Sequence, residues 1–184
     1  DMWNGRYLVK EISLQAIFIQ PTVSYKINEK FGLGAGLDIV LGSVDLSQAI
    51  ASPVNGQFNM QGKSTALGFN VGAYIKPTEK INIGIDYRSK VNMKVTDGET
   101  QFTEIPSSLE PYFPSSGNFD AELPLPANLD FGLSYQVTEK FLLAAELNII
   151  FWSVYDSLII DFKENNEKLV DSRSPSEYRN SFIP

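Results

Sequence analysis

The stretch from Ile81 to Thr96 most constrains what this chain can fold into, because apolar and polar side chains alternate through it. The odd positions are apolar except Ser89, whereas the even positions carry no apolar side chain and include Asp86, Arg88 and Lys90. A period of two predicts a β-strand with one face in an apolar medium and the other in a polar one, such as a water-filled lumen. At ~3.3 Å per residue the stretch would be roughly 50 Å long, and a strand tilted by ~45° crosses a bilayer in only ~9–11 residues. We therefore predict a transmembrane β-strand.

The composition removes several classes of protein from consideration. The chain of 184 residues has a formal net charge of −7, so an interaction with nucleic acid has no electrostatic support. It contains no Cys and no His, which leaves out disulfides, thiolate metal sites and histidine-dependent catalysis. The carboxylates near the C-terminus lack the dense Asp/Asn alternation of a calcium loop. We expect no enzyme activity, no cofactor and no metal.

The same alternation recurs along the chain and predicts an all-β, antiparallel fold. No apolar run approaches the ~18 residues of a membrane-spanning helix, and alternation keeps the hydropathy of a membrane β-barrel low. Proline at Gln20-Pro21 indicates a bulge or strand end, and an apparent change of phase near Gly42-Ser43 indicates a second bulge. About six strands are predicted, over residues 13–27, 31–46, 64–75, 81–96, 129–137 and 141–162. We expect one partial β-barrel domain over residues 1–184, with long loops at about 49–61 and 97–126.

Three similar units mark tight turns between the long strands. Residues 25–31 and 135–141 match each other, and residues 74–81 repeat the unit with one residue added. Short turns at one end and long, extracellular loops at the other are typical of outer-membrane barrels. A tyrosine precedes each turn, where an aromatic girdle at the membrane interface would lie. The alternative is a soluble β-sandwich or lipocalin-like barrel in which these tyrosines are ordinary strand residues.

Three segments together resemble the long-chain fatty acid transporter family of Gram-negative outer membranes (OmpP1/FadL/TodX). They are Pro21 to Leu37, Leu123 to Tyr135, and Trp152-Ser153 with the strand residues after it. The resemblance implies a fourteen-stranded barrel with an N-terminal hatch and an inner hydrophobic pocket. Six strands would leave open edges in lipid, so the chain is interpreted as an internal fragment of a larger barrel. The alternative is that other segments were left out of this sequence.

The resemblance also implies a function. It is the passive, ligand-gated uptake of hydrophobic compounds across the outer membrane, with long-chain fatty acids as the expected ligands. The expected partners are a fatty acid or another apolar small molecule, membrane lipid and lipopolysaccharide, around a monomeric barrel. The alternative is a structural or adhesive outer-membrane barrel without transport activity.

Two groups of residues are candidates for ligand contact. In the long loop we expect an apolar capture surface made by Leu109, Tyr112, Phe113 and Phe119. The alternative is that these side chains only pack the loop against the rim of the barrel.

In the lumen, Arg88 and Lys90 are candidates to attract a fatty-acid carboxylate. The alternative is that they pair with Asp86, Glu146 or Asp38 on neighbouring strands. Trp152 either lines the lumen or belongs to the aromatic girdle.

Overall fold

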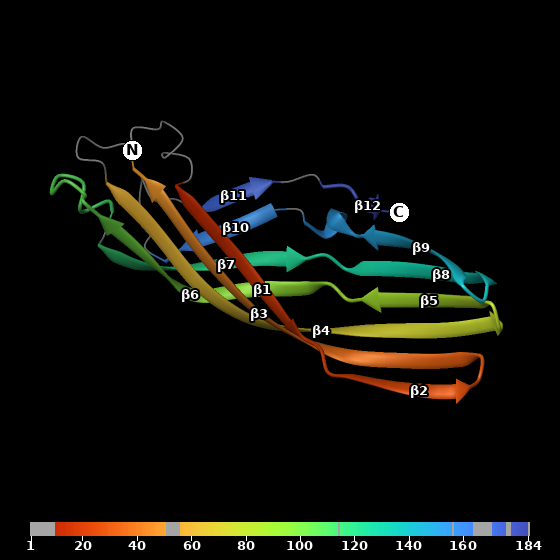
Figure 1. Cartoon of the computed structure of the whole chain (residues 1–184). Coiled ribbons are helices and arrows are strands. Elements are labelled where there is room, and N and C mark those ends of the chain that lie inside the picture. The colour runs from red at the N-terminus through yellow and green to blue at the C-terminus, as the bar shows by residue number, and fades with distance from the viewer. Residues whose placement is uncertain are drawn as a thin grey trace.

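The fold is a single curved, antiparallel β-sheet (Figure 1). The computed structural model describes residues 10–50, 56–113, 115–155, 157–163, 171–175 and 178–183, and these form twelve strands. The strands are β1 (Glu11–Ile19), β2 (Thr22–Asn28), β3 (Phe31–Ala49), β4 (Gln57–Thr78), β5 (Ile81–Arg88), β6 (Val91–Thr103), β7 (Ser116–Leu125), β8 (Asn128–Thr138), β9 (Phe141–Ile150), β10 (Ser157–Phe162), β11 (Ser172–Pro175) and β12 (Ser181–Ile183). A single turn of 3₁₀ helix, η2 (Trp152–Val154), precedes β10. No helix in this part of the chain is long and apolar enough to cross a membrane.

The predicted all-β, antiparallel class is confirmed, but the strands outnumber the six predicted. One reason is that long strands are interrupted: β1 and β2 both pair with β3, and β5 and β6 both pair with β4. The other is that β7 occupies part of the predicted loop 97–126, and β6 extends to Thr103, so this connection covers only residues 104–115. The loop predicted at about 49–61 also ends earlier than predicted, because β4 begins at Gln57. Residues 51–55 of this loop lie outside the described part of the chain.

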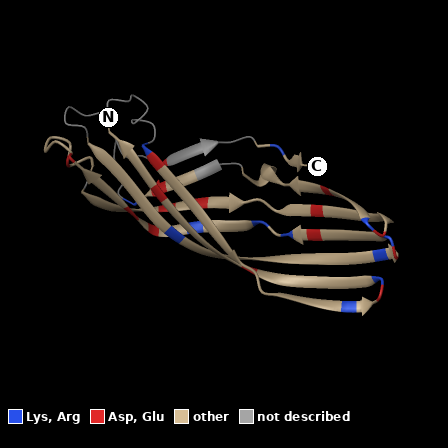
Figure 2. Ribbon diagram, viewed as in Figure 1, with Lys and Arg blue, Asp and Glu red and all other residues tan. Residues whose placement is uncertain are grey.

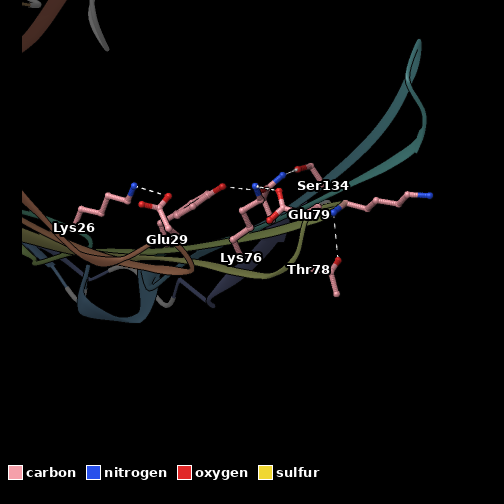
Figure 3. A network of polar contacts seen from close by, with 9 residues as sticks. Lys26, Glu29, Lys76, Thr78, Glu79 and Ser134 are labelled. Carbon is pink, nitrogen blue, oxygen red and sulfur yellow. Dashed lines mark hydrogen bonds and ion pairs between the residues drawn. The ribbon is translucent and has the colours of Figure 1, made fainter.

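The predicted tight turns are confirmed, and those in the described residues lie together at one end of the sheet, the turn end (Figure 1). Each is a Glu-Lys pair whose lysine backbone N–H donates to a side-chain oxygen two residues earlier. These bonds join Lys30 to Asn28 (2.8 Å), Lys80 to Thr78 (3.3 Å) and Lys140 to Thr138 (3.4 Å). Ion pairs Lys26–Glu29 (2.7 Å) and Lys76–Glu79 (2.6 Å) brace two of the turns (Figure 3). Local side-chain bonds of this kind explain why the Asn/Thr-Glu-Lys sequence recurs.

The tyrosines before these turns do not all belong to a girdle. Tyr25 and Tyr135 pair with Leu33 and Leu143 on the outer, apolar face. Tyr74 instead donates a hydrogen bond to Asn82 on the inner face. The cause is the extra residue in its turn unit, because successive strand residues point to opposite faces.

Strand β3 runs unbroken through the sheet, yet the polarity of its two faces inverts along it. Near the turn end its outer positions are apolar, from Leu33 to Leu41, and beyond that they become Ser43, Asp45 and Ser47. Its pairing with β4 shows no irregularity, so the bulge predicted at Gly42-Ser43 is wrong. The apparent change of phase is this inversion. The opposed outer residues of β4 change in the same way, from Leu67 to Thr65 and Lys63.

Strands β5 and β6 reach the same inversion by a different route. The alternation predicted for 81–96 as one strand is broken at Ser89-Lys90, which turns the odd positions from the outer to the inner face. Ile83 and Ile85 therefore lie outside, whereas Val91 and Met93 are buried inside. Ser89 bridges the break, because its hydroxyl accepts the Phe69 N–H (2.9 Å) and its N–H donates to the Phe69 carbonyl (2.8 Å).

Candidate functional site: an apolar pocket inside the curved sheet

An apolar pocket of about 300 Å³ lies on the inner face in the half of the sheet away from the turns, the loop-end half. Strands β1, β3, β4, β6, β7 and β10 form its wall, with Tyr155 after η2. The lining residues are Ile12, Leu14, Gln15, Ala16, Gly42, Ser43, Val44, Leu46, Met60, Ser64, Met93, Val95, Phe119, Ala121, Leu123, Leu125, Tyr155 and Ile160. None of these described lining residues is charged, so the pocket suits an uncharged apolar molecule.

The pairing register explains why apolar side chains converge here. Directly opposed residues of antiparallel strands share a face, so Leu14 meets Val44 and Met93 meets Leu123. Gly42 leaves room for Met93, since a Cβ on Gly42 would lie 2.6 Å from the Met93 methyl group. The pocket is thus a direct product of the polarity inversion.

The loop-end side of the pocket is closed by an aromatic cluster. Met60, Phe102, Phe119 and Phe162 are buried there, with Phe119 fully inaccessible. The ring of Phe102 lies 5.4 Å from that of Phe113 in the 104–115 connection. The 104–115 connection therefore packs on the sheet through apolar contacts beside the pocket.

On its turn-end side the pocket meets a polar belt centred on Arg88. The guanidinium of Arg88 lies 5.5 Å from the Phe18 ring centroid, and its terminal nitrogen donates to Gln20 Oε1 (3.4 Å). Its Nε lies 3.8 Å from Oδ2 of Asp38, whose side chain is fully buried. A buried carboxylate needs such a charged neighbour, because desolvation without one is costly.

Beyond this belt the inner face is open, and acidic positions mark the neighbouring strands β5, β8 and β9 (Figure 2). Asp86 of β5 is directly opposite Asp130 of β8, and Glu146 of β9 borders the same cavity of about 590 Å³, which Lys26, paired with Glu29, also lines. A Cβ placed on Gly84 or Gly132 would meet no atom within 4 Å, so these glycines leave the lumen wide. No three acidic side chains in the described residues are placed to hold a metal ion.

The predicted capture residues fall in two places. Leu109, Tyr112 and Phe113 lie in the 104–115 connection and are half-buried, and Phe113 packs against the aromatic cluster. Phe119 does not lie in a loop: it is in β7, opposite Phe162, and it lines the pocket. The reason is that Phe119, Ala121, Leu123 and Leu125 alternate as strand residues despite the prolines around them.

The remaining candidates are also separated. Arg88 faces the lumen and pairs with Asp38, which was one of the expected alternatives. Lys90 lies exposed in the break between β5 and β6. Trp152 is in η2, between β9 and β10, with its ring 6.2 Å from that of Tyr178.

Several pocket residues were not anticipated from the sequence. Met93 and Val95 were assigned to the lipid face, because the alternation gives no sign that the faces exchange at Ser89-Lys90. Tyr155 follows the Trp-Ser pair, and its ring packs edge-on against Tyr178 at 5.1 Å. The alternation of residues 119–125 was the signal that could have located this wall of the pocket.

The family of the chain follows from comparison with known proteins. The model of the outer membrane protein transport protein family (OMPP1/FadL/TodX) matches residues 1–183. The chain belongs to this family. Membership places it in the outer membrane of Gram-negative bacteria, in a family of outer-membrane transport proteins. No curated protein sequence matches the chain.

Solved structures of the OMPP1/FadL/TodX family share the fold. A Pseudomonas aeruginosa FadL homologue superposes with a TM-score of 0.80 at 23% identity, over 98% of this chain and 47% of its own. The Ralstonia pickettii toluene transporter TbuX superposes with a TM-score of 0.73 at 18% identity, over 92% of this chain and 50% of its own. The CymD monoaromatic hydrocarbon channel superposes with a TM-score of 0.72 at 21% identity, over 92% of this chain and 53% of its own. The chain therefore spans about half the length of these structures.

Proposed function

We propose that this chain forms part of the wall of an outer-membrane channel through which uncharged hydrophobic compounds diffuse passively. The observation that carries the proposal is the uncharged pocket on the inner face of the sheet. Its volume of about 300 Å³ is roughly twice the ~150 Å³ of a cavity that holds benzene, so one or two fused rings would fit. Two structural relatives, a toluene transporter and a monoaromatic hydrocarbon channel, support this ligand class.

The long-chain fatty acids implied by the resemblance fit the described residues less well. A bound carboxylate would need a cation near the pocket, and Arg88 is already paired with Asp38. In the cavity toward the turn end, Asp86, Asp130 and Glu146 would repel an anion, and the one lysine that lines this cavity, Lys26, is paired with Glu29. The structure thus favours a hydrocarbon over a fatty acid, although an alkyl tail would suit the pocket walls.

The surroundings of the channel follow from the outer face. The loop end is proposed to face the cell exterior, because outer-membrane barrels carry their longer loops there. Membrane lipid would surround the part of the outer face with apolar side chains, from Leu33 to Leu41 on β3. Lipopolysaccharide would surround the polar part of the outer face, which begins beyond Leu41 on β3 and at Thr65 on β4. Diffusion down a gradient needs no catalytic group, so no enzyme activity is proposed.

The test compares two identical substitutions on opposite faces. Ala121→Phe fills the pocket, whereas Ala35→Phe adds the same ring on the lipid-facing side. Binding of fluoronaphthalene and of oleate is measured by fluorine NMR and by competition, on purified protein in amphipol. We expect Ala121→Phe to weaken fluoronaphthalene binding at least tenfold, Ala35→Phe to leave it unchanged, and oleate to compete weakly. If Ala121→Phe bound fluoronaphthalene as the wild type does, the pocket would not be the binding site. Strong competition by oleate would support a long-chain fatty acid as the ligand instead of a hydrocarbon.

A further inference from the structure

A serine hydroxyl interrupts the apolar wall of the pocket. Of the described strand residues that line the pocket, only Gln15, Ser43 and Ser64 have polar side chains. Gln15 and Ser43 are directly opposed at outer-face positions, because the adjacent residue Leu14 points inward and successive strand residues alternate between faces. Ser64 of β4 is directly opposite Gly42 and shares its inner face. The Ser64 hydroxyl is therefore the one polar side-chain group that these strands turn into the pocket.

This hydroxyl has no hydrogen-bond partner among the described residues. Ser64 is only 9% exposed, and its Oγ is buried and unpaired there. Its inner-face neighbours along β4, Gly62 and Ala66, offer no side-chain acceptor. An unpartnered buried hydroxyl is unfavourable and rare in folded proteins. Because an alanine would fill the same position without burying a polar atom, packing alone does not explain a serine here.

The hydroxyl lies next to a side chain that can give way. A Cβ on Gly42 would lie 2.6 Å from the terminal methyl group of Met93. Directly opposed residues have Cβ positions ~4.5–5.5 Å apart, so this methyl group lies beside the Ser64 side chain. Methionine is unbranched and flexible, so it fills an irregular gap and changes rotamer readily. A ligand that moves the Met93 methyl group therefore meets the Ser64 hydroxyl.

We propose that the pocket binds an uncharged aromatic molecule that carries one hydrogen-bonding group, such as a phenol, and that Ser64 pairs with this group. A serine hydroxyl both donates and accepts, so it can bond a phenolic hydroxyl in either sense. The apolar walls would contact the ring, and a charged group would find no counter-charge among the described lining residues. The inference rests on the proposed function, since it names a ligand class for the same pocket. It makes Ser64 a residue that determines specificity, because a ligand without a polar group leaves the hydroxyl unpaired.

The test compares two probes that differ by one hydroxyl, fluoronaphthalene and fluoronaphthol. Fluorine NMR on purified protein in amphipol gives both dissociation constants at pH ~7, where a phenolic hydroxyl with a pKa of ~10 is uncharged. In the wild type we expect the two constants to agree within about threefold, because the bond to Ser64 offsets the water that the naphthol hydroxyl loses. Ser64→Ala should weaken fluoronaphthol binding about fivefold, the effect of one net hydrogen bond, and change fluoronaphthalene binding by less than about twofold.

The matched control is Thr65→Ala, which removes a hydroxyl from the next residue of β4. Thr65 is exposed on the outer face, so this variant should leave both dissociation constants unchanged. The urea unfolding midpoint of Ser64→Ala should equal or exceed that of the wild type, because the variant removes an unpaired buried group.

Three outcomes would contradict this account. An unchanged preference between the two probes in Ser64→Ala would overturn the role of Ser64 and leave the pocket intact. Equal weakening of both probes, with a lower unfolding midpoint, would overturn it in favour of a structural role. Failure of the wild-type protein to bind either probe would overturn the proposed function itself.

Discussion

Replacing Leu37 and Asp45 by arginine is expected to have very different costs, although both lie on the outer face of β3. Leu37 lies within the apolar outer band and Asp45 lies beyond the inversion. At ~3.3 Å per residue and a tilt of ~40°, the outer positions from Phe31 to Leu41 cover ~25 Å of height, the size of the apolar band of an outer-membrane barrel. Leu37 is then close to the bilayer midplane, where an arginine costs ~2–4 kcal/mol, and Asp45 is outside the hydrocarbon.

The assay is reversible urea unfolding in lipid vesicles, followed by tryptophan fluorescence. Leu37→Arg should lower the free energy of unfolding by about 3 kcal/mol, and Asp45→Arg by less than about 1 kcal/mol. Equal losses for the two variants would refute the polarity inversion as a membrane boundary. A neutral Leu37→Arg would refute the lipid contact of this face.

Two further predictions concern single contacts. Ser89→Ala removes the acceptor of the Phe69 N–H at the break between β5 and β6 and should lower the free energy of unfolding by ~1–2 kcal/mol, measured by urea denaturation. The hydrogen bonds that Asp120 accepts from Lys163 and from the Asp97 N–H hold the pKa of Asp120 below its ordinary value. This contribution to stability is therefore complete above pH ~4 and is lost as the pH falls through the lower, folded-state pKa. Asp120→Asn should remove this pH-dependent contribution. Urea unfolding midpoints measured from pH ~3 to ~6 should then change less with pH in the variant than in the wild type.

The local features of the fold were predictable because each is encoded by neighbouring residues. The turn units carry their own stabilising bonds, so Asn28 and Thr78 indicate tight turns before any tertiary contact is known. Alternation likewise identified strands such as Phe31 to Leu41 and placed their apolar positions together on one face of the sheet. Both signals depend on residues within a few positions of each other.

The pocket was not predictable, because it depends on which face each strand turns inward. The alternation of apolar and polar residues continues through Ser89-Lys90 and does not reveal that the strand exchanges its two faces there, so the sequence predicts that Met93 faces lipid, whereas it is buried inside. In β3 the sequence predicts a bulge where none exists, because an unbroken strand whose two faces exchange polarity has the same sequence pattern as a bulge. Long-range pairing decides between the two cases. The contacts of Arg88 across β4 and β3 likewise require the curvature of the assembled sheet.

The most direct test of the account uses two adjacent positions of β3 in a chain that contains no native cysteine. Val44 lines the pocket and Asp45 is exposed on the outer face, so Val44→Cys and Asp45→Cys place a thiol on each side of the same wall. Labelling by a small polar thiol reagent is measured on purified protein in amphipol with and without fluoronaphthalene. The account predicts that fluoronaphthalene slows labelling at position 44 at least tenfold and leaves rapid labelling at position 45 unchanged. Equal labelling of the two thiols, with no protection by the ligand, would contradict it.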